Sequence, residues 1–193
     1  AADLSQYRIY RYNNSSAVWD LIYTDTQPVS AASAVTSVYT DTALDTKNNS
    51  YSYRIQTVDE CGYAYPLDSL TAHTTINVST ARTGLIIDVS WTPYAGCNFN
   101  EYRIFRRELP SGSSVMIGTV PSSTLQFRDT TILCPYQYEY RIQTDDLCGL
   151  PYQSWSDTSS IWPENIFEGQ HSDLIKTTVV NNEYTLTEWL PPV

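Results

Sequence analysis

One stretch of twelve residues occurs twice in almost the same form, and this repetition constrains the fold more than any other feature. "YSYRIQTVDECG", residues 51–62, returns as "YEYRIQTDDLCG", residues 138–149, which is 87 positions later (138 minus 51). "YRIYR" at residues 7–11 likewise returns as "YRIFR" at residues 102–106, 95 positions later (102 minus 7). A period near 90 is too long for helical solenoid repeats and favours a series of small domains.

A third repeat sets the boundaries of the units. His73 and His171 each lie 18 residues before a tryptophan, Trp91 and Trp189, and these two pairs repeat at a spacing of 98 (189 minus 91). No such tryptophan precedes the first "YRI" segment, and no such segment follows the last tryptophan. We therefore expect an excerpt from a longer array with three parts. These are a unit lacking its first two strands (1–75), a complete unit (76–163) and the first two strands of a further unit (164–193).

Strand-like alternation recurs in both units. In "YEYRIQT", residues 138–144, the tyrosines, the isoleucine and the threonine share one face, a period of two that half-buries a strand. "YSYRIQT", residues 51–57, predicts the same half-buried face, with Ile55 and Thr57 on it. The 16 tyrosines also favour sheets, since aromatic residues fit a pleated surface. We predict an all-β chain, and a second-unit core made of Trp91, Tyr102, Ile104, Tyr138, Tyr140 and Ile142.

The order of these strands resembles the fibronectin type III domain. The features that carry the resemblance are a tryptophan late in the second strand (Trp91), a Tyr-x-Ile third strand at residues 102–104 and a tyrosine opening the sixth strand. The resemblance implies tandem immunoglobulin-like (fibronectin type III) β-sandwiches. It also implies that Tyr51 and Tyr138 each close a tyrosine corner by bonding to backbone upstream.

A narrower similarity concerns "D-x-C-G" after the sixth strand, together with "WTPYAGC" and "YRIFR". These segments are similar to fibronectin-type repeats of long surface proteins that gliding bacteria export by type IX secretion. The resemblance implies a non-catalytic structural spacer in the stalk of a large secreted or cell-surface protein, for example an adhesin linked to gliding motility. Its expected partners are neighbouring domains of the same long chain, other copies, or surface proteins of secretion and motility.

The type III topology also has consequences for the four cysteines. It places the loop after the second strand and the loop after the sixth strand at the same pole, which implies a disulfide between Cys97 and Cys148. Such a bond implies an oxidising, extracellular or cell-surface location. Cys134 lies at the opposite pole, about ten extended residues from Cys148, so these two cannot pair within one sandwich. Cys61 matches Cys148 in the repeat. The partners of Cys61 and Cys134 stay open.

Other chemistry has little support in the sequence. The cysteines lack the close pairing of a metal site, and the acidic pairs at residues 59–60 and 145–146 supply few of the six to eight oxygens that calcium needs. The two histidines are interpreted as linker residues. No serine has a candidate base beside it, so we expect no catalysis, no cofactor and no metal. A net charge of −10 disfavours binding to nucleic acid. The sequence contains no run of eighteen apolar residues, so we expect no insertion into a membrane.

Two alternatives to the spacer remain. Exposed aromatics could bind sugar rings, so a carbohydrate-binding accessory module of a secreted polysaccharide-degrading enzyme would use Tyr152 and Trp155. A chain complete as it stands could instead form a fibre, with its last strands exchanged into the first unit of the next copy. In addition, Asp-Ser/Thr-apolar motifs like those that carry O-linked glycans in gliding bacteria point to three candidate attachment residues, Thr42, Ser69 and Thr130.

Overall fold

The structure is a computed structural model that describes residues 4–26, 38–133, 136–145, 147–163, 174–180 and 184–189. Within these ranges the regular elements are strands and two single 3-10 turns, η1 (Leu67–Ser69) and η2 (Leu147–Gly149), so the chain is all-β as predicted. None of the described segments forms a helix of the length and apolarity that crossing a bilayer requires. The strands are β1 (Leu4–Asn13), β2 (Val18–Asp25), β3 (Ser52–Asp59), β4 (His73–Thr74), β5 (Val78–Thr83), β6 (Ile86–Trp91), β7 (Glu101–Leu109), β8 (Val115–Pro121), β9 (Gln126–Asp129), β10 (Gln137–Thr144), β11 (Ser159–Ile161), β12 (Leu174–Val180) and β13 (Tyr184–Trp189).

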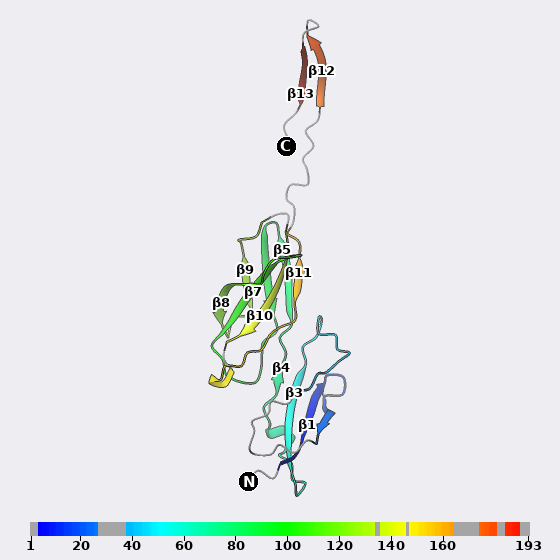
Figure 1. Ribbon diagram of the computed structural model, residues 1–193, viewed down its shortest axis with the longest axis vertical. Coiled ribbons are helices and arrows are strands. Elements are labelled where there is room, and N and C mark those ends of the chain that lie inside the picture. Colours follow the sequence, from blue (N-terminus) through cyan, green and yellow to red (C-terminus); the bar gives the residue numbers. More distant parts are fainter. Residues whose placement is uncertain are drawn as a thin grey trace.

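The middle of the chain forms a two-layer sandwich (Figure 1). One layer has the strand order β5-β6-β9 and the other the order β11-β10-β7-β8, and the paired strands are antiparallel. Three strands facing four in this order is the arrangement of the immunoglobulin-like, fibronectin type III sandwich. Both layers alternate apolar and polar residues, so each turns one apolar face toward the other.

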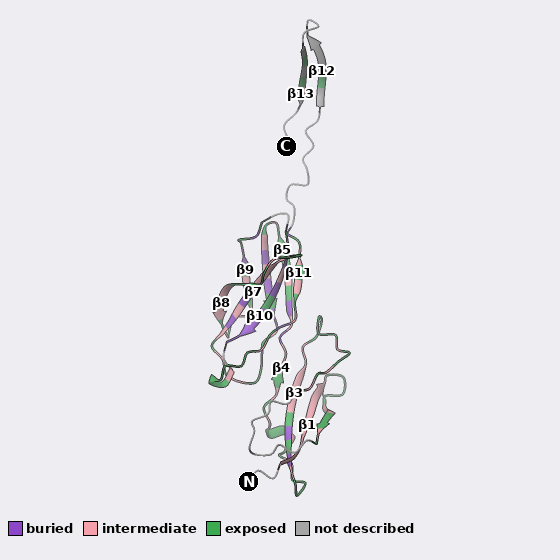
Figure 2. Cartoon of the chain, in the orientation of Figure 1, coloured by how far each residue is buried: buried purple, intermediate pink, exposed green. Residues whose placement is uncertain are grey.

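The core of the molecule lies between these two layers, where Figure 2 shows most of the buried residues. Because alternate residues of a strand face the same way, the inward positions of β6, β7 and β10 meet in the middle. Trp91 and Tyr102 contact edge to face, with ring centroids 5.4 Å apart. The six residues predicted for this core are all buried: Trp91, Tyr102, Ile104, Tyr138, Tyr140 and Ile142.

The first part of the chain forms one four-stranded sheet, which we call the first sheet. Its order, β2-β1-β3-β4, repeats the order β8-β7-β10-β11 of the sandwich strand for strand. Ile9 pairs with Ile55 as Ile104 pairs with Ile142. An irregularity in the pairing follows Ile9 in β1, and another follows Ile104 in β7. The repeated sequence therefore specifies the same strand register twice.

The two units differ in what covers these strands. Ile142 is fully buried, whereas the equivalent Ile55 is 59% exposed, because no second layer packs on the first sheet in the described part of the chain. On β3 the neighbours of Ile55 on the other face, Gln56 and Val58, are buried instead. The expectation that Ile55 and Thr57 lie on the half-buried face is therefore wrong for this unit.

A returning loop explains the burial of Gln56 and Val58. The segment after β3 folds back across the strand, so that the Gln56 side-chain amide donates to the carbonyl oxygen of Tyr65 and Val58 forms a β-bridge with Ala64. The loop after β10 does the same in the sandwich, where Gln143 bridges to Trp155. Among the described residues, the sandwich alone also has a layer on the opposite face.

The last described strands, β12 and β13, form a hairpin that pairs with no other described strand. Its register joins Leu174 to Trp189 at one end and Val180 to Tyr184 at the other. The predicted linker position His171 lies outside the described residues.

Candidate functional site

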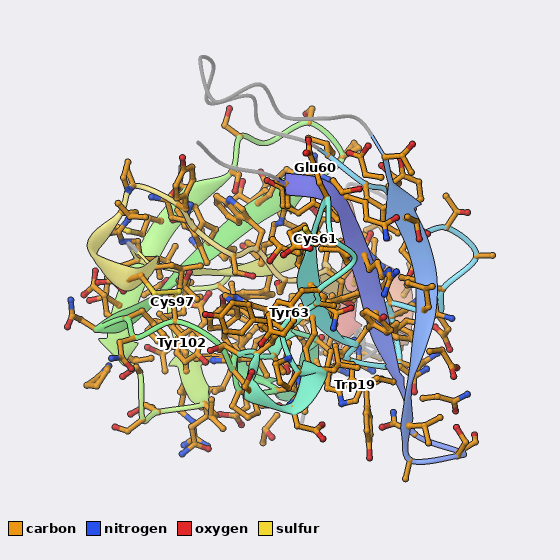
Figure 3. The ribbon with its side chains drawn as sticks, turned by 90° about the horizontal axis from the view of Figure 1, so that it is seen from below. Trp19, Glu60, Cys61, Tyr63, Cys97 and Tyr102 are labelled. Atoms are coloured by element: carbon orange, nitrogen blue, oxygen red, sulfur yellow. A yellow bond between two sulfur atoms is a disulfide. The ribbon has the colours of Figure 1, made fainter. Side chains whose placement is uncertain are left out.

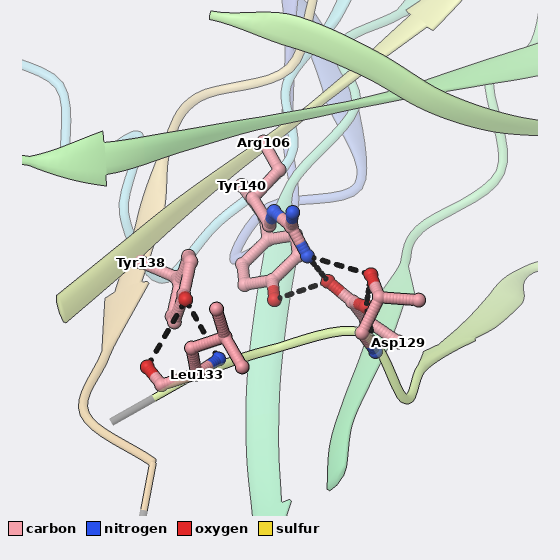
Figure 4. A network of polar contacts seen from close by, with 6 residues as sticks. Arg106, Asp129, Leu133, Tyr138 and Tyr140 are labelled. Carbon is pink, nitrogen blue, oxygen red and sulfur yellow. Dashed lines mark hydrogen bonds and ion pairs between the residues drawn. The ribbon is translucent and has the colours of Figure 1, made fainter. Parts of the chain in front are cut away.

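A buried polar cluster holds the two layers of the sandwich together (Figure 4). Arg106 Nη1 donates to Asp129 Oδ2 at 2.7 Å, and the Tyr140 hydroxyl donates to the same oxygen at 2.9 Å. The backbone N–H and hydroxyl of Thr131 both donate to the other oxygen, Oδ1, at 2.9 Å. The carboxylate of Asp129 lies at the end of β9, while Arg106 and Tyr140 belong to the facing layer. The cluster therefore bridges the two sheets.

The electrostatics of this cluster are those of a fixed structural brace. Burial alone would raise the pKa of Asp129, but the bonds from Thr131, Arg106 and Tyr140 hold that pKa below its ordinary value. Burial, and then the bond to Asp129, raise the pKa of Tyr140, so its phenol stays protonated. Each carboxylate oxygen accepts two hydrogen bonds, Oδ2 from the two residues of the facing layer and Oδ1 from Thr131, so the arrangement braces the fold.

The first unit contains the same cluster. Arg11 Nη1 lies 2.7 Å and the Tyr53 hydroxyl 2.9 Å from Asp41 Oδ2, the same two distances as in the sandwich. Arg11 and Arg106 are the last residues of "YRIYR" and "YRIFR", and each aspartate begins an Asp-Thr pair. This repeated Arg and Asp-Thr was the signal that our sequence analysis did not use, because it treated the Asp-Thr pairs only as glycan motifs.

The two tyrosines expected to close tyrosine corners both bond to backbone upstream. The Tyr138 hydroxyl accepts from Leu133 N–H at 2.8 Å and donates to Leu133 O at 3.1 Å (Figure 4). The Tyr51 hydroxyl accepts from Asp45 N–H at 3.1 Å. Each bond ties the loop before the strand to the strand itself.

A disulfide joins Cys97 to Cys148, with the two Cα atoms 5.1 Å apart. It connects the loop after β6 to the 3-10 turn after β10. The corresponding position in the first unit, Cys61, is an exposed free thiol (Figure 3). Cys134 lies outside the described residues. The disulfide is compatible with an oxidising, extracellular compartment.

Removing this disulfide is expected to lower the free energy of unfolding of the sandwich by about 2–4 kcal/mol, because the bond closes a loop of 51 residues in the unfolded chain. The double variant Cys97→Ser, Cys148→Ser should show this loss in urea denaturation followed by circular dichroism. Cys61→Ser, at an exposed thiol, is the matched control and should change little. A loss in the control equal to that in the double variant would contradict the prediction.

The acidic pairs considered for calcium are engaged in local bonds. Asp145 Oδ1 accepts from the backbone N–H of Asn100 at 2.8 Å and of Glu101 at 3.3 Å, and Asp146 lies outside the described residues. Asp59 Oδ1 accepts from Tyr63 N–H at 2.7 Å. Within the described ranges no three potential ligand side chains gather as a metal site would require.

The two aromatics considered for carbohydrate binding are both exposed, Tyr152 by 64% and Trp155 by 39%. The Arg141 guanidinium covers one face of the Trp155 ring at 4.6 Å, and Phe105 packs against the ring at 5.0 Å. A sugar stacks on a free ring face, and Arg141 occupies one face of Trp155. The cation–π contact with Arg141 and the tilted packing of Phe105 together hold the indole in its position.

The three candidate glycan attachment residues, Thr42, Ser69 and Thr130, are exposed. Ser69 Oγ donates to Pro66 O at 2.7 Å within the turn η1. The aspartates that precede Thr42 and Thr130 belong to the polar clusters described above, so these two Asp-Thr pairs also have a structural role.

The boundary between the first sheet and the sandwich is a network of hydrogen bonds, which we call the seam. Thr74 N–H donates to Ala95 O at 3.0 Å, and His73 Nδ1 lies 2.7 Å from the Tyr94 hydroxyl. Gly96 lies against His73, so closely that a side chain at this position would collide with the imidazole. His73, interpreted from the sequence as a linker residue, is thus a contact of this seam.

Asn77 is the centre of the seam. Its side-chain amide nitrogen donates to Thr46 O and to Lys47 O, both at 2.8 Å, and lies 3.2 Å from Asp157 Oδ2 in the sandwich. Asp157 Oδ1 in turn accepts from Val78 N–H at 2.7 Å. One side chain therefore joins a loop of the first unit to the segment that precedes β11 in the sandwich.

No protein-family model matches this sequence, and no curated protein matches it. Solved structures with a similar fold include the two fibronectin type III domain segment from chicken tenascin, at 15% identity and a TM-score of 0.35, covering 83% of this chain and 84% of that one. The chicken interferon gamma receptor alpha chain has 12% identity and a TM-score of 0.38, covering 85% and 88%. Pectate lyase PelI from Erwinia chrysanthemi has 11% identity and a TM-score of 0.39, covering 50% of this chain. The match spans 29% of that lyase.

Proposed function

We propose that this chain is a non-catalytic spacer segment, built of fibronectin type III units, in a large secreted or cell-surface protein. The observation that carries the proposal is the hydrogen-bonded seam. A stiff spacer, which keeps other domains at a set distance, requires that the angle between its units is held. Relative motion between neighbouring domains is the default unless something restrains it.

The linker at the seam is short and tied to both units. Only residues 75–77 separate the end of β4 from the start of β5. Thr75 N–H donates to Tyr51 O of the first sheet at 2.9 Å, and Asn77 O accepts from Thr92 N–H of the sandwich at 3.0 Å. A net contribution of about 0.5–1.5 kcal/mol for each such bond is enough for several of them to favour one inter-unit angle.

Bonds beside the linker add to this restraint. Ser50 Oγ donates to Thr92 Oγ1 at 3.1 Å, next to the contacts of Asn77 and His73. The seam thus has contacts on several sides of the linker rather than along one line, which opposes both bending and twisting. Polar seams of this kind suit a stalk, since they stiffen it without exposing an apolar surface when they open.

The parent protein we propose is an adhesin of a gliding bacterium exported by type IX secretion. The "D-x-C-G" segment, which occurs twice, and the segments "WTPYAGC" and "YRIFR" support this, as does a disulfide compatible with an oxidising compartment. In that setting the partners of the chain are the neighbouring domains of the stalk. Adhesion itself would belong to other domains.

The spacer proposal is tested by loosening the seam. Asn77→Ala removes the amide that joins the two units, so we expect the first sheet and the sandwich to reorient independently while both stay folded. Residual dipolar couplings measure this directly, because a rigid pair shares one alignment tensor and a mobile pair does not. The expected result is one shared tensor in the unchanged chain and two different tensors in the variant.

Ser79→Ala is the matched control. Ser79 lies two residues further along, on β5, where its hydroxyl is 2.9 Å from Ser90 Oγ of the neighbouring strand, within the sandwich. This variant should keep the shared tensor. Independent alignment of the two units in the unchanged chain would refute a stiff seam and with it the spacer proposal.

A further inference from the structure

The loop that follows β6, residues 92–100, carries both a contact of the seam and one end of the disulfide, and we call it the seam loop. Its Ala95 O accepts from Thr74 N–H of the first sheet at 3.0 Å. Two residues later, Cys97 bonds to Cys148 in the turn that follows β10. The disulfide therefore fixes to the body of the sandwich the same loop that meets the first unit.

A short series of contacts leads from the disulfide to the first unit. Burial raises the pKa of Tyr94, and a hydrogen bond from the backbone of Cys97 to the Tyr94 hydroxyl opposes this rise. Because the hydroxyl accepts from Cys97, its own proton is available to His73 Nδ1 of the first sheet, 2.7 Å away. The position of Cys97 thus orients a hydroxyl that joins the two units.

The fit at this contact leaves little room for movement. Gly96 has a φ of +136°, and a Cβ added to it would lie 2.6 Å from His73 Nδ1 and 2.9 Å from the hydroxyl oxygen of Tyr94. The bond from Tyr94 to His73 is lost once its atoms are more than about 3.5 Å apart, so a shift of the seam loop by about 1 Å is enough to break it.

Two hydrogen bonds anchor the seam loop to the sandwich independently of the sulfur atoms. Tyr94 N–H donates to the buried hydroxyl of Tyr102 at 2.9 Å, and Asn98 O accepts from Cys148 N–H at 2.9 Å. Breaking the S–S bond leaves both anchors and the core in place. Residues 95–97, between the anchors, lose their covalent restraint and gain conformational freedom.

The disulfide is open to attack from one side. Cys148 is exposed, whereas Cys97 is half-buried. A hollow of about 630 Å³ lies beside Cys148, and it is also lined by Asn98, Phe99 and Gly149. The rate of thiol–disulfide exchange depends on access to the sulfur that is attacked. An incoming thiol is therefore expected to attack Cys148 and to displace Cys97.

We propose that the Cys97–Cys148 bond is a redox-active site, which accepts two electrons from a dithiol and thereby releases the seam so that the two units reorient. One thiolate of the dithiol attacks Cys148 Sγ, forms a mixed disulfide and displaces Cys97 as a thiolate, which takes up a proton. The second thiol of the dithiol, after losing its proton, attacks its own sulfur in the mixed disulfide. Cys148 leaves as a thiolate and is protonated, and the dithiol ends as a disulfide.

This inference rests on the proposed function, because releasing the seam has an effect only where the seam holds the angle between the units. It adds a condition to that function. The spacer is stiff while the disulfide is intact and flexible after a dithiol has reduced it, with both units folded in either state.

Residual dipolar couplings of the full-length chain, measured before and after treatment with dithiothreitol, test the proposal. We expect one shared alignment tensor in the oxidised chain and two different tensors in the reduced chain, with each unit still fitted by a single tensor. Alkylation with iodoacetamide and peptide mass spectrometry measure the reduction of Cys97 and Cys148 in the same sample. Circular dichroism shows whether the fold is retained.

The double variant Cys97→Ser, Cys148→Ser is the control for the reductant. Its units should have two different tensors both with and without dithiothreitol. A shared tensor in this variant would mean that the disulfide does not hold the seam, and would overturn the proposal.

Tyr94→Phe tests the route from the disulfide to the first unit while the S–S bond stays intact. It removes the hydroxyl between Cys97 and His73, so the tensors of the two units should differ even in the oxidised chain, although less than after reduction. Tyr152→Phe is the matched control, because Tyr152 is 64% exposed, and it should keep the shared tensor. Equal effects of the two variants would contradict this route.

The outcomes separate this proposal from the spacer proposal. A reduced chain that keeps one shared tensor, a sandwich that unfolds on reduction, or a bond that dithiothreitol does not reduce in the folded chain would each overturn the redox-active site and leave the stiff seam of the oxidised chain unaffected. Two different tensors already in the oxidised, unchanged chain would instead refute the spacer proposal, and the redox-active site with it.

Discussion

Trp91→Ala is expected to lower the free energy of unfolding of the sandwich by about 3–5 kcal/mol, the range for removing a large buried aromatic. Trp91 is 5% exposed at the end of β6, and its ring contacts the ring of Tyr102 edge to face. Alanine would leave a cavity between two sheets whose strands are held by their neighbours and cannot collapse into it. The total free energy of unfolding of a native domain is about 5–15 kcal/mol, so the variant should be only marginally stable.

Urea denaturation followed by circular dichroism measures this loss. Trp162→Ala is the matched control, because Trp162 is 53% exposed and its removal leaves no cavity in the core. The control should change stability by less than about 0.5 kcal/mol. A loss below about 1 kcal/mol in Trp91→Ala would mean that the residue does not support the inter-sheet core.

Asp129→Ala is expected to lower the free energy of unfolding by a similar amount, about 3–5 kcal/mol, for an electrostatic reason. The side chains of Asp129 and Arg106 are only 2% and 14% exposed, so the variant leaves a guanidinium largely buried without its counter-charge. It also leaves the buried hydroxyl of Tyr140 without its acceptor. Thermal and urea denaturation should both show the loss.

Asp88→Ala provides the contrast. Asp88 also bonds an arginine, Arg128, at 2.7 Å, but both side chains are well exposed, at 41% and 65%. Surface ion pairs contribute about 0–1 kcal/mol, because water screens them and solvates either partner alone. Equal effects of Asp129→Ala and Asp88→Ala would contradict a stabilising role for the buried cluster.

The pH dependence separates the charge of Asp129 from its packing. The folded protein holds the pKa of Asp129 below its ordinary value, so the unfolded chain takes up a proton at this residue at a higher pH than the folded chain does. The associated stability is present above the unfolded pKa of about 3.9 and is lost as pH falls through the lower, folded pKa. Asp129→Ala should therefore remove part of the acid sensitivity of unfolding, whereas Asp88→Ala should keep it.

The repeats and the alternation in the sequence were sufficient to predict strands and the core of the sandwich. Alternation of aromatic and β-branched residues decides which side chains share a face, and this is local information, so Trp91, Tyr102 and Ile142 were placed in the core without a structure. The disulfide was expected from the resemblance to the fibronectin type III domain, whose topology places the two cysteine-bearing loops at one pole. The partners of Asp129 could not be found in this way, because Arg106 and Tyr140 approach it only when the two layers pack.

Burial, by contrast, was decided by the tertiary structure. "YRIQT" occurs in both units with the same register, yet Ile142 is fully buried and Ile55 is 59% exposed. The strand sequence determines that these side chains point to the same face in each unit. Whether that face is dry depends on a second layer from distant parts of the chain, which the sandwich has in β5, β6 and β9 and the first sheet lacks among the described residues. The alternation of side chains along a strand is set by its own backbone. Their burial is set by the other segments that pack against the strand and exclude water from it.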